Sequence, residues 1–450
     1  MGGRTCKRRL ELGHRLKVIA LGCLLITGIA PATWAQLSYE QPPINYGSAT
    51  PDDAVQDLIH RIQQGHTSLE YSPRHGWLPD LLEAMHISPE SQVLVFSKTS
   101  LQLHKISPRT PRAIYFNDDV YVGWCQNGDV VEIAATDPRL GSVFYTVDQT
   151  DTREIKISRD RGGCLTCHAS HRTQDIPGLL VRSIYSDFNG RPRTGTRTYV
   201  TDHTTPFEQR YGGWYVTGEH GTIRHMGNLI STNREHPEEI DRDAGANRLD
   251  LTEFFDVSPY LRPHSDMVAL MVLEHQTQMH NLLARLAIET RLAQHYDEGM
   301  NEILGRPPGS ISDSTKRRIA TAGEKLVRYM LFADETPLNS EIRGPSRYRE
   351  LFETGAIGPV YEDSRGRHLR QFDLERRMFK YPCSFLIYSK AFRELPPLAL
   401  EWVCNRLKEV LSAESPPDGY ESLSDEDRRA VLEILEDTLP TLFRSPATAT

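Results

Sequence analysis

The segment Cys164-Leu165-Thr166-Cys167-His168 constrains this chain more than any other stretch of its 450 residues. Cys-x-x-Cys-His is the spacing at which c-type haem is attached to proteins. Two thiols at this spacing can form thioether bonds to the vinyl groups on one porphyrin edge, and the following imidazole can bind the iron as proximal ligand. We therefore expect one covalent haem c, held by Cys164 and Cys167, with His168 as an axial iron ligand.

Three other kinds of site use a Cys-x-x-Cys pair: a thioredoxin-like redox dithiol, half of a zinc site, and a disulfide. A zinc site needs a second pair of Cys or His ligands, and the sequence contains no second Cys-x-x-Cys. A redox dithiol opens a helix after a strand in a βαβ unit, and the residues around Cys164 do not show that pattern. The histidine after the second cysteine favours haem. Gly162 and Gly163 would let the backbone come close to the macrocycle.

The N-terminus has the organisation of a secretory signal peptide. Six basic residues precede an apolar run at 18–29, which is too short to span a bilayer comfortably. Thr33 and Ala35 supply the small side chains of a cleavage site, so we expect residues 1–35 to be removed and the mature chain to begin at Gln36. This predicts a periplasmic protein, with an uncleaved signal anchor as the alternative.

Net charge bears on the kind of partner. The whole chain carries a formal charge of −8; residues 1–35 hold six Lys or Arg and one Glu, a net +5, so the remainder carries −13. An acidic exported protein is a poor binder of nucleic acid. No later segment is apolar enough for a transmembrane helix. We expect a redox partner protein, and a basic one could dock on an acidic surface.

The pattern of apolar residues predicts an α+β fold with three successive regions. Residues 36–157 contain short runs of branched and aromatic residues at a spacing of roughly ten, typical of an antiparallel sheet. Residues 158–262 are rich in Gly, Pro, Arg and His, and we expect a loop-rich region wrapped around the haem. Residues 263–443 have helical periodicity. Residues 444–450 are expected to form a disordered tail.

Within these regions the sequence predicts individual elements. The expected strands are 92–96, 113–116, 120–124, 130–135, 143–147, an edge strand at 154–157, 179–185 and 214–217. The expected helices are one capped by Thr50 and ended by Gly65, then 78–85, 267–294 with its end marked by Gly299, 315–332, 398–411, and 425–438 capped by Ser424.

The sixth iron ligand separates two functional classes, because an electron carrier commonly uses Met or His there, whereas a catalytic or ligand-binding haem leaves the position open. His225 and Met226 lie on a short loop between glycines that could approach the ring. His275 lies on the apolar face of the helix expected at 267–294, with His280 on its polar side. We expect the distal ligand to be His225, Met226 or His275, with an open position as the alternative. Weaker candidates are His171, His203 and His220.

Other residues could contact the porphyrin. Haem propionates need cationic partners, and arginine binds carboxylates bidentately. Candidates near the motif, if they are not simply a solvated basic stretch, are Arg182, Arg191, Arg193 and Arg197. Trp214 and Tyr215 could pack on the porphyrin edge or in an ordinary core.

Three cysteines of the mature chain lie outside the motif. Cys125 falls in an apolar strand and is expected to be a small buried side chain. Cys383 and Cys404 could form a disulfide, which spacing alone does not decide.

Several stretches together resemble a family of exported bacterial proteins described as cytochrome c domain-containing. The matching stretches are 115–118, 120–124, 164–168, 212–218, 224–228, 274–281 and 381–389. The resemblance implies covalent haem binding and electron transfer, with Cys164, Cys167 and His168 as the haem residues. It supplies no substrate and no distal ligand. Small class I cytochromes differ: they are compact and helical, with the motif near the mature N-terminus, so their fold and distal methionine do not carry over.

The sequence therefore favours an exported single-haem c-type cytochrome that transfers electrons. Its length exceeds what one haem requires, which keeps two alternatives open. One is a haem enzyme of the peroxidase-type oxidoreductase class, and the other is a haem-based sensor or structural binding protein. The sequence has no Ser-His-Asp order, phosphate-binding glycine loop or His-Glu-x-x-His motif.

Overall fold

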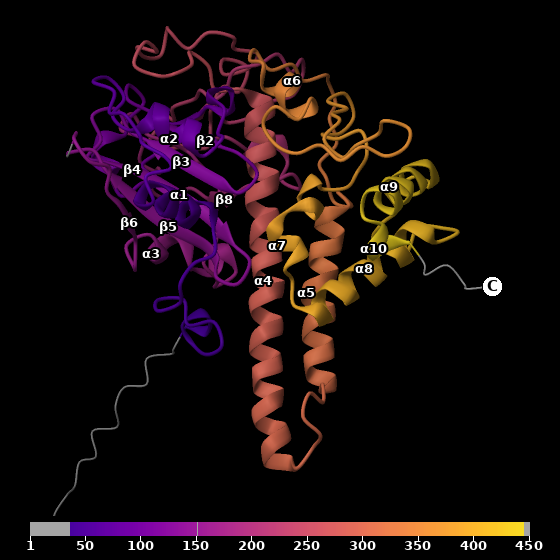
Figure 1. Ribbon diagram of the computed structural model, residues 1–450. Coiled ribbons are helices and arrows are strands. Elements are labelled where there is room, and N and C mark those ends of the chain that lie inside the picture. The colour runs from indigo at the N-terminus through magenta and orange to yellow at the C-terminus, as the bar shows by residue number, and fades with distance from the viewer. Residues whose placement is uncertain (1–36, 151, 445–450) are drawn as a thin grey trace, which may run out of the picture. The chain divides into compact units, whose positions relative to one another are not determined.

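Seven antiparallel strands form the main sheet, and helices dominate the C-terminal half of the chain, so the α+β prediction is confirmed (Figure 1). The computed structural model describes residues 37–150 and 152–444. The predicted leader, its cleavage site and most of the predicted tail lie outside the described residues. The strands, in sheet order, are β6 (Ile157–Arg159), β5 (Gly141–Asp148), β4 (Val130–Asp137), β3 (Val120–Trp124), β2 (Arg112–Phe116), β1 (Val93–Val95) and β9 (Trp214–Tyr215).

Local turn chemistry explains the hairpins of this sheet. Between β2 and β3, the side-chain oxygen of Asn117 accepts hydrogen bonds from the Asp119 and Val120 amides at 3.1 and 2.9 Å. Between β4 and β5, Asp137 accepts from two amides, and Gly141 adopts a φ of 81° that favours glycine. These turns fix the register of the hairpins.

Alternation along the strands gives the sheet two buried faces. Phe116 pairs with Tyr121, and both side chains belong to the core shared with α4 (Met267–Leu304). Tyr115 pairs with Val122 one residue away, and both belong to the core shared with α1 (Ala54–Gln63) and α2 (Leu78–Ala84). The sheet is therefore the middle layer between α1 and α2 on one side and α4 on the other.

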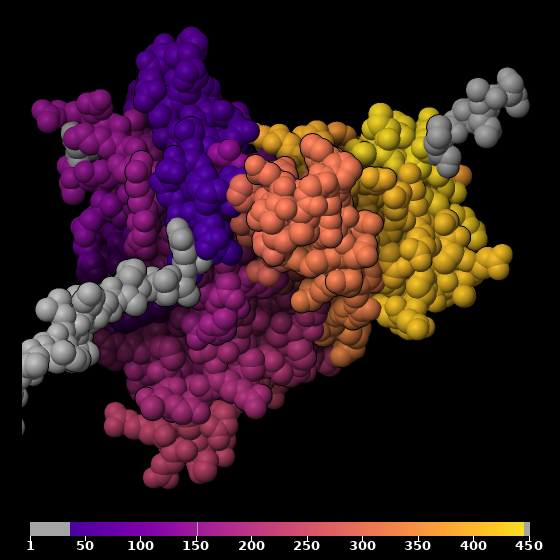
Figure 2. Space-filling view, turned by 90° about the horizontal axis from the view of Figure 1, so that it is seen from below, coloured from indigo at the N-terminus to yellow at the C-terminus, as the bar shows by residue number. Residues whose placement is uncertain are grey.

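Two predicted helix ends are wrong. Helix α1 is capped by Asp53 rather than Thr50, because the Asp53 carboxylate accepts from the Val55 and Gln56 amides while Tyr145 donates to its other oxygen. Helix α4 runs through Gly299 and ends at Gly305, which has a left-handed φ of 61°. Its last turn is exposed, with Ile303 76% accessible, at the tip of the hairpin that α4 forms with α5 (Figure 2).

The burial of α4 shows that the predicted position of His280 on a polar face is wrong. His280 is buried rather than on a polar face, because the sheet covers that side of the helix and the His280 Nε2 lies 2.8 Å from the Asp118 carbonyl oxygen. On another side α4 packs against α5 (Asp313–Met330). Most side chains from Met267 to Ile288 are buried, so amphipathic periodicity gives an incomplete picture of this helix.

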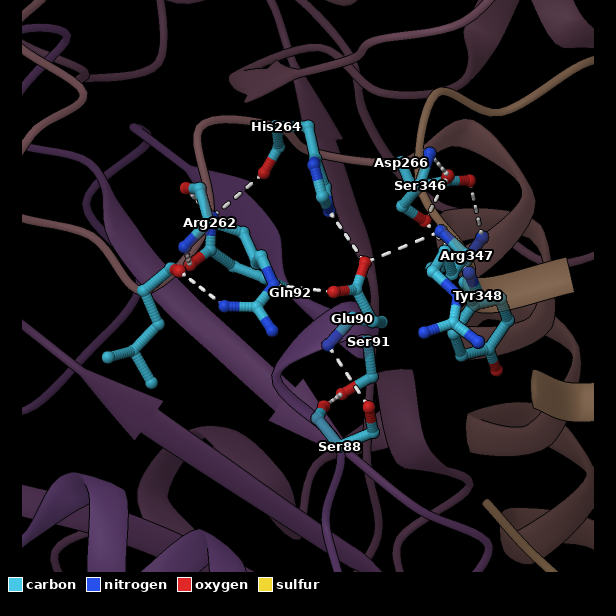
Figure 3. Close-up of polar contacts among 12 residues, drawn as sticks. Ser88, Glu90, Ser91, Gln92, Arg262, His264, Asp266, Ser346, Arg347 and Tyr348 are labelled. Atoms are coloured by element: carbon cyan, nitrogen blue, oxygen red, sulfur yellow. Dashed lines mark hydrogen bonds and ion pairs between the residues drawn. The ribbon is translucent and has the colours of Figure 1, made fainter. Parts of the chain in front are cut away.

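A polar cluster anchors the start of α4 to the sheet and to the segment before α6 (Figure 3). Asp266 caps the helix, and its second carboxylate oxygen accepts from the Ser346 amide and hydroxyl at 3.0 and 2.5 Å. Glu90 pairs with the Arg262 Nε at 2.5 Å. Gln92 donates to the Arg262 and His264 carbonyl oxygens. These contacts hold α4 in a fixed position across the sheet.

None of the remaining elements is longer than α5. The other helices are α3 (Leu165–His168), α6 (Tyr348–Glu353), α7 (Lys390–Arg393), α8 (Pro397–Ser412), α9 (Asp425–Thr438) and α10 (Pro440–Phe443). Short 3-10 turns lie at Ser38–Glu40, Pro89–Ser91, Leu103–Lys105, His171–Thr173, Phe207–Gln209 and Phe385–Tyr388. A second sheet pairs β7 (Arg182–Ile184) with β8 (Thr198–Val200). Strand β7 lies within the strand predicted at 179–185, whereas β8 was not predicted. Over residues 37–150 and 152–444, no helix has the length and apolar character needed to cross a bilayer.

Candidate functional site

The Cys-x-x-Cys-His motif forms one helical turn, α3, directly after the edge strand β6. Asp160 shapes this turn, because its carboxylate accepts from the Cys164 amide at 2.9 Å and the Gly162 amide at 3.2 Å. Positions i, i+3 and i+4 of a helical turn share a face, so both cysteines and His168 lie on one side of α3. Cys164 is partly buried and Cys167 is exposed.

Histidine 168 is held in the tautomer that a metal ligand requires. Its Nδ1 lies 2.9 Å from the carbonyl oxygen of Gly178, so Nδ1 carries the proton and Nε2 keeps its lone pair. Phe144 of β5 packs on the ring at a centroid distance of 4.8 Å. Burial lowers the pKa of His168 and therefore favours the neutral imidazole. A neutral imidazole with one hydrogen-bonded nitrogen is the usual state of a ligating histidine.

The carbonyl that orients His168 is fixed in turn by α4. The amide of Asn281 bridges the backbone of Leu179: its oxygen accepts from the Leu179 N–H at 2.8 Å, and its nitrogen donates to the Leu179 carbonyl at 2.7 Å. Gly178 permits this close approach, since a Cβ there would lie 2.5 Å from the Asn281 oxygen. Asn281 is therefore a positioning residue for His168.

A cavity of about 270 Å³ opens beside the motif, near the lower end of the range for ligand sites, roughly 300–1,000 Å³. It lies between the α4-facing side of the sheet and an opposing wall built from the chain after the motif. The sheet contributes Ile114, Tyr121, Ala134, Phe144 and, from the edge strand β9, Trp214; the opposing wall contributes Leu179, Val181, Leu273 and Thr277. Cys164, Cys167 and His168 also line the cavity. Two largely apolar walls beside the motif suit the faces of a flat porphyrin.

Charged side chains on the cavity wall suit the porphyrin's two propionates. Lys98, Arg112 and Arg182 are cationic, and Glu132 pairs with Arg112 at 2.5 Å, which leaves a net charge of +2. The Nε atoms of Arg112 and Arg182 are buried and have no hydrogen-bond partner. Unpaired guanidinium nitrogens next to a cavity fit bidentate binding of carboxylates. Gly123 makes room for Arg112, whose guanidinium lies where a Cβ would be.

The sequence identified only part of this charged set. Of the four arginines predicted to bind propionates, only Arg182 lines the cavity; Arg193 donates instead to the Ser231 carbonyl. Lys98 and Arg112 were missed. The sequence does contain opposite charges, Arg112 and Glu132, in the strands on either side of the strand that holds Gly123. This pair was the one signal that could have pointed to the charged side of the cavity. Trp214 lines the cavity, whereas Tyr215 packs in the core on the opposite face of the sheet.

None of the three predicted distal ligands lies on the cavity wall. His225 is buried, and its Nδ1 accepts from the Gly227 amide at 3.0 Å. Met226 is buried over Gly212, with its sulfur 3.8 Å from the Ser183 hydroxyl. His275 is a fully hydrogen-bonded core histidine, and its partners are described below. The structure therefore does not bring these three side chains to His168, and their role as sixth ligand stays a prediction without geometric support.

His275 belongs to a buried polar network on the other side of the 179–182 segment. Its Nδ1 lies 2.9 Å from the His203 Nδ1, and its Nε2 lies 2.8 Å from the Ser384 hydroxyl. Beside it, Arg210 and Glu274 form an ion pair at 3.3 Å, with side chains 1% and 0% exposed. Burial raises the pKa of Glu274 to about 7, although Arg210 opposes the shift. Sequence reasoning missed this network, whose only local signal is a carboxylate within an apolar helix.

The competing site types lack support. Among residues 37–150 and 152–444, no three His, Cys, Asp or Glu side chains are grouped to hold a metal ion. Burial, with a contribution from Asp160, raises the pKa of Cys164 to about 12, whereas a reactive redox thiol has a lowered pKa. Cys125, Cys383 and Cys404 are buried free thiols, so Cys383 and Cys404 are not joined in this structure. No family model, curated protein or solved structure matches the chain.

Proposed function

We propose that this protein is an exported single-haem c-type cytochrome that transfers electrons to or from a redox partner protein. One observation carries the proposal: Cys164, Cys167 and His168 share one helical turn at a largely apolar cavity, and the hydrogen bond from His168 Nδ1 to Gly178 leaves Nε2 free to ligate. Neither a zinc site nor a redox dithiol needs such a cavity.

The residues present fit a haem in chemistry as well as in position. The two cysteines would hold the porphyrin covalently and His168 would bind the iron, which supplies a one-electron Fe(III)/Fe(II) couple when bound. The apolar walls exclude water, and low polarity around an iron raises its reduction potential. Arg112 and Arg182 would bind the propionates. Cys167 is exposed, so the porphyrin edge beside it would be accessible to a partner protein.

Covalent attachment is the decisive test. We expect the protein, produced with a c-type haem maturation system, to keep its haem after denaturation and acid-acetone extraction. The Cys164→Ala, Cys167→Ala double variant should lose it, whereas Cys404→Ala, which changes a buried thiol on α8 that does not line the cavity, should keep it. Loss of haem from the unaltered protein on extraction would refute the proposal. Export predicts periplasmic protein that begins at Gln36, and an intact Met1 on cytoplasmic protein would contradict it.

An alternative is a haem enzyme of the peroxidase-type oxidoreductase class or a haem-based sensor. The position of His225, Met226 and His275 away from the cavity wall favours this alternative over a carrier with two protein ligands, because both an enzyme and a sensor need a sixth position that exogenous molecules can reach.

A further inference from the structure

Lys98 and Glu132, the charged side chains on the cavity wall that could ligate iron, already make hydrogen bonds or ion pairs within the protein. The Lys98 ammonium donates to the carbonyl oxygens of Leu103 and Ile106 at 2.8 and 2.6 Å. Glu132 pairs with Arg112 through one oxygen and accepts from Ser100 at 2.6 Å through the other. Recruiting either group to iron would break these contacts and leave charged partners unpaired, which is costly in a partly buried site.

The neutral lining groups are also poor ligands. Tyrosine binds haem iron as a phenolate, and burial raises the pKa of Tyr121 well above its usual value, so it stays protonated. The Tyr121 hydroxyl also accepts from the Gln276 amide at 2.8 Å. The Thr277 hydroxyl donates to the Glu274 carbonyl within α4. Among the described residues that line the cavity, His168 is therefore the one suitable ligand.

The predicted distal residues are held away from the cavity by specific contacts. Moving His275 would break its hydrogen bonds to His203 and Ser384 and remove its ring from between the stacked rings of Tyr329 and Phe332. Each of these buried polar groups would then lack a hydrogen-bond partner, which destabilises the fold. Met226 fills the space above Gly212, so withdrawing it would open a void in the core.

The polarity of the cavity indicates the class of ligand. Leu179, Val181 and Leu273 on its wall are 6, 2 and 2% exposed, whereas Leu101 and Leu103 are about half exposed. The cationic groups are partly exposed and are matched in charge to the propionates. In the ferrous state the iron and the porphyrin ring together carry no net charge, so an anion that enters an apolar pocket pays its full desolvation cost, which a small neutral molecule avoids.

We infer that the sixth iron position, in the haem protein proposed above, is open to exogenous ligands and takes neutral diatomic gases, the class of carbon monoxide and nitric oxide. This inference rests on the proposed function. It adds that the iron has one protein ligand, His168, and that its sixth position is accessible. Two observations support this inference. The side chains of Lys98, Glu132 and Tyr121 are already held by other contacts, and His275 and Met226 pack away from the cavity.

Visible spectroscopy of the purified holoprotein tests the inference. We expect the ferrous protein to be high-spin and to give a saturable Soret shift with carbon monoxide. His225→Ala, Met226→Ala and His275→Ala should each keep this spectrum and this response. A low-spin ferrous spectrum that resists carbon monoxide would overturn the inference, as would a low-spin spectrum that any one of the three variants converts to high-spin.

A second ligand tests the neutral class. Cyanide, an anion, should leave the ferrous spectrum unchanged at concentrations where carbon monoxide saturates the ferrous form, and a saturable cyanide shift in that range would refute the assignment. Different results would refute the proposed function and the open sixth position. Protein without covalent haem refutes the proposed function, whereas covalent haem with an unreactive six-coordinate iron refutes only the open sixth position.

Discussion

Asn281 offers the sharpest test of how α4 supports the haem motif. Replacing it with alanine removes both hydrogen bonds to the Leu179 backbone, at 2.8 and 2.7 Å, and leaves a buried N–H and a buried carbonyl without partners. At about 1–3 kcal/mol for each buried group, we expect the free energy of unfolding to fall by about 2–6 kcal/mol. This is a large part of the roughly 5–15 kcal/mol that stabilises a typical protein.

Urea denaturation followed by circular dichroism measures this loss. Asn281→Asp keeps the oxygen that accepts from Leu179 but loses the donor and buries a carboxyl group, so its loss should be at least that of one orphaned group, about 1–3 kcal/mol. Glu302→Ala, at an exposed position on the same helix, is the matched control and should stay within about 0.5 kcal/mol of the unaltered protein.

The haem-loaded protein gives a second readout of the same variant. With the Leu179 backbone released, the adjacent Gly178 carbonyl should no longer fix the His168 ring, and the visible spectrum of Asn281→Ala should change. The reasoning would be refuted if Asn281→Ala unfolded at the same urea concentration as Glu302→Ala and kept the parent spectrum, because Asn281 would then contribute neither stability nor positioning.

Three further predictions concern the rest of the molecule. The pKa of Glu274 is raised to about 7 in the folded state, so the folded protein binds a proton that the unfolded chain releases. The contribution of Glu274 to the free energy of unfolding therefore falls as pH rises from about 4.5 to about 7. Glu274→Gln should reduce this pH dependence in urea melts measured across the range, and an unchanged pH dependence would contradict the prediction. Asp266→Ala should lower the free energy of unfolding by about 1–2 kcal/mol through the lost cap and by about 1–3 kcal/mol more through the lost bonds to Ser346. Asp266→Asn can keep the cap but not the bonds to Ser346, so its loss should be smaller; equal losses in the two variants would argue against the cap. Thiol titration of denatured, unreduced holoprotein should find three free thiols, and a value of one would indicate a disulfide between two of Cys125, Cys383 and Cys404.

Elements set by local chemistry could be read from the sequence. The strands of the β2–β3 hairpin were predicted at 113–116 and 120–124 because runs of branched and aromatic residues lie on both sides of the short turn that contains Asn117. Helix α9 was predicted to the residue, since Ser424 and Asp427 form a reciprocal capping box. The end of α4 was misplaced because Gly299 lies within a helix whose backbone hydrogen bonds outweigh the preference of one glycine.

Elements set by tertiary contacts could not be read in this way. The cavity's charged pair depends on the register that places Arg112 and Glu132 on either side of Gly123, and no local pattern reports register between strands. His280 reads as a surface residue until the β2–β3 turn covers it. Likewise β9, predicted as part of the haem region, joins the main sheet beside β1, a pairing across more than a hundred residues.

The chain order of the two cavity walls sets the order in which an exported chain would deliver them to the periplasm. The sheet wall, β2 to β5, would arrive first and the attachment motif next, while Leu179–Val181, β9 and α4 would follow. A porphyrin attached when the motif emerges would meet one apolar wall, and the later wall would then fold against the second porphyrin face. The cofactor would act as a template for the C-terminal half, and a chain that missed attachment would have to close this cavity around solvent.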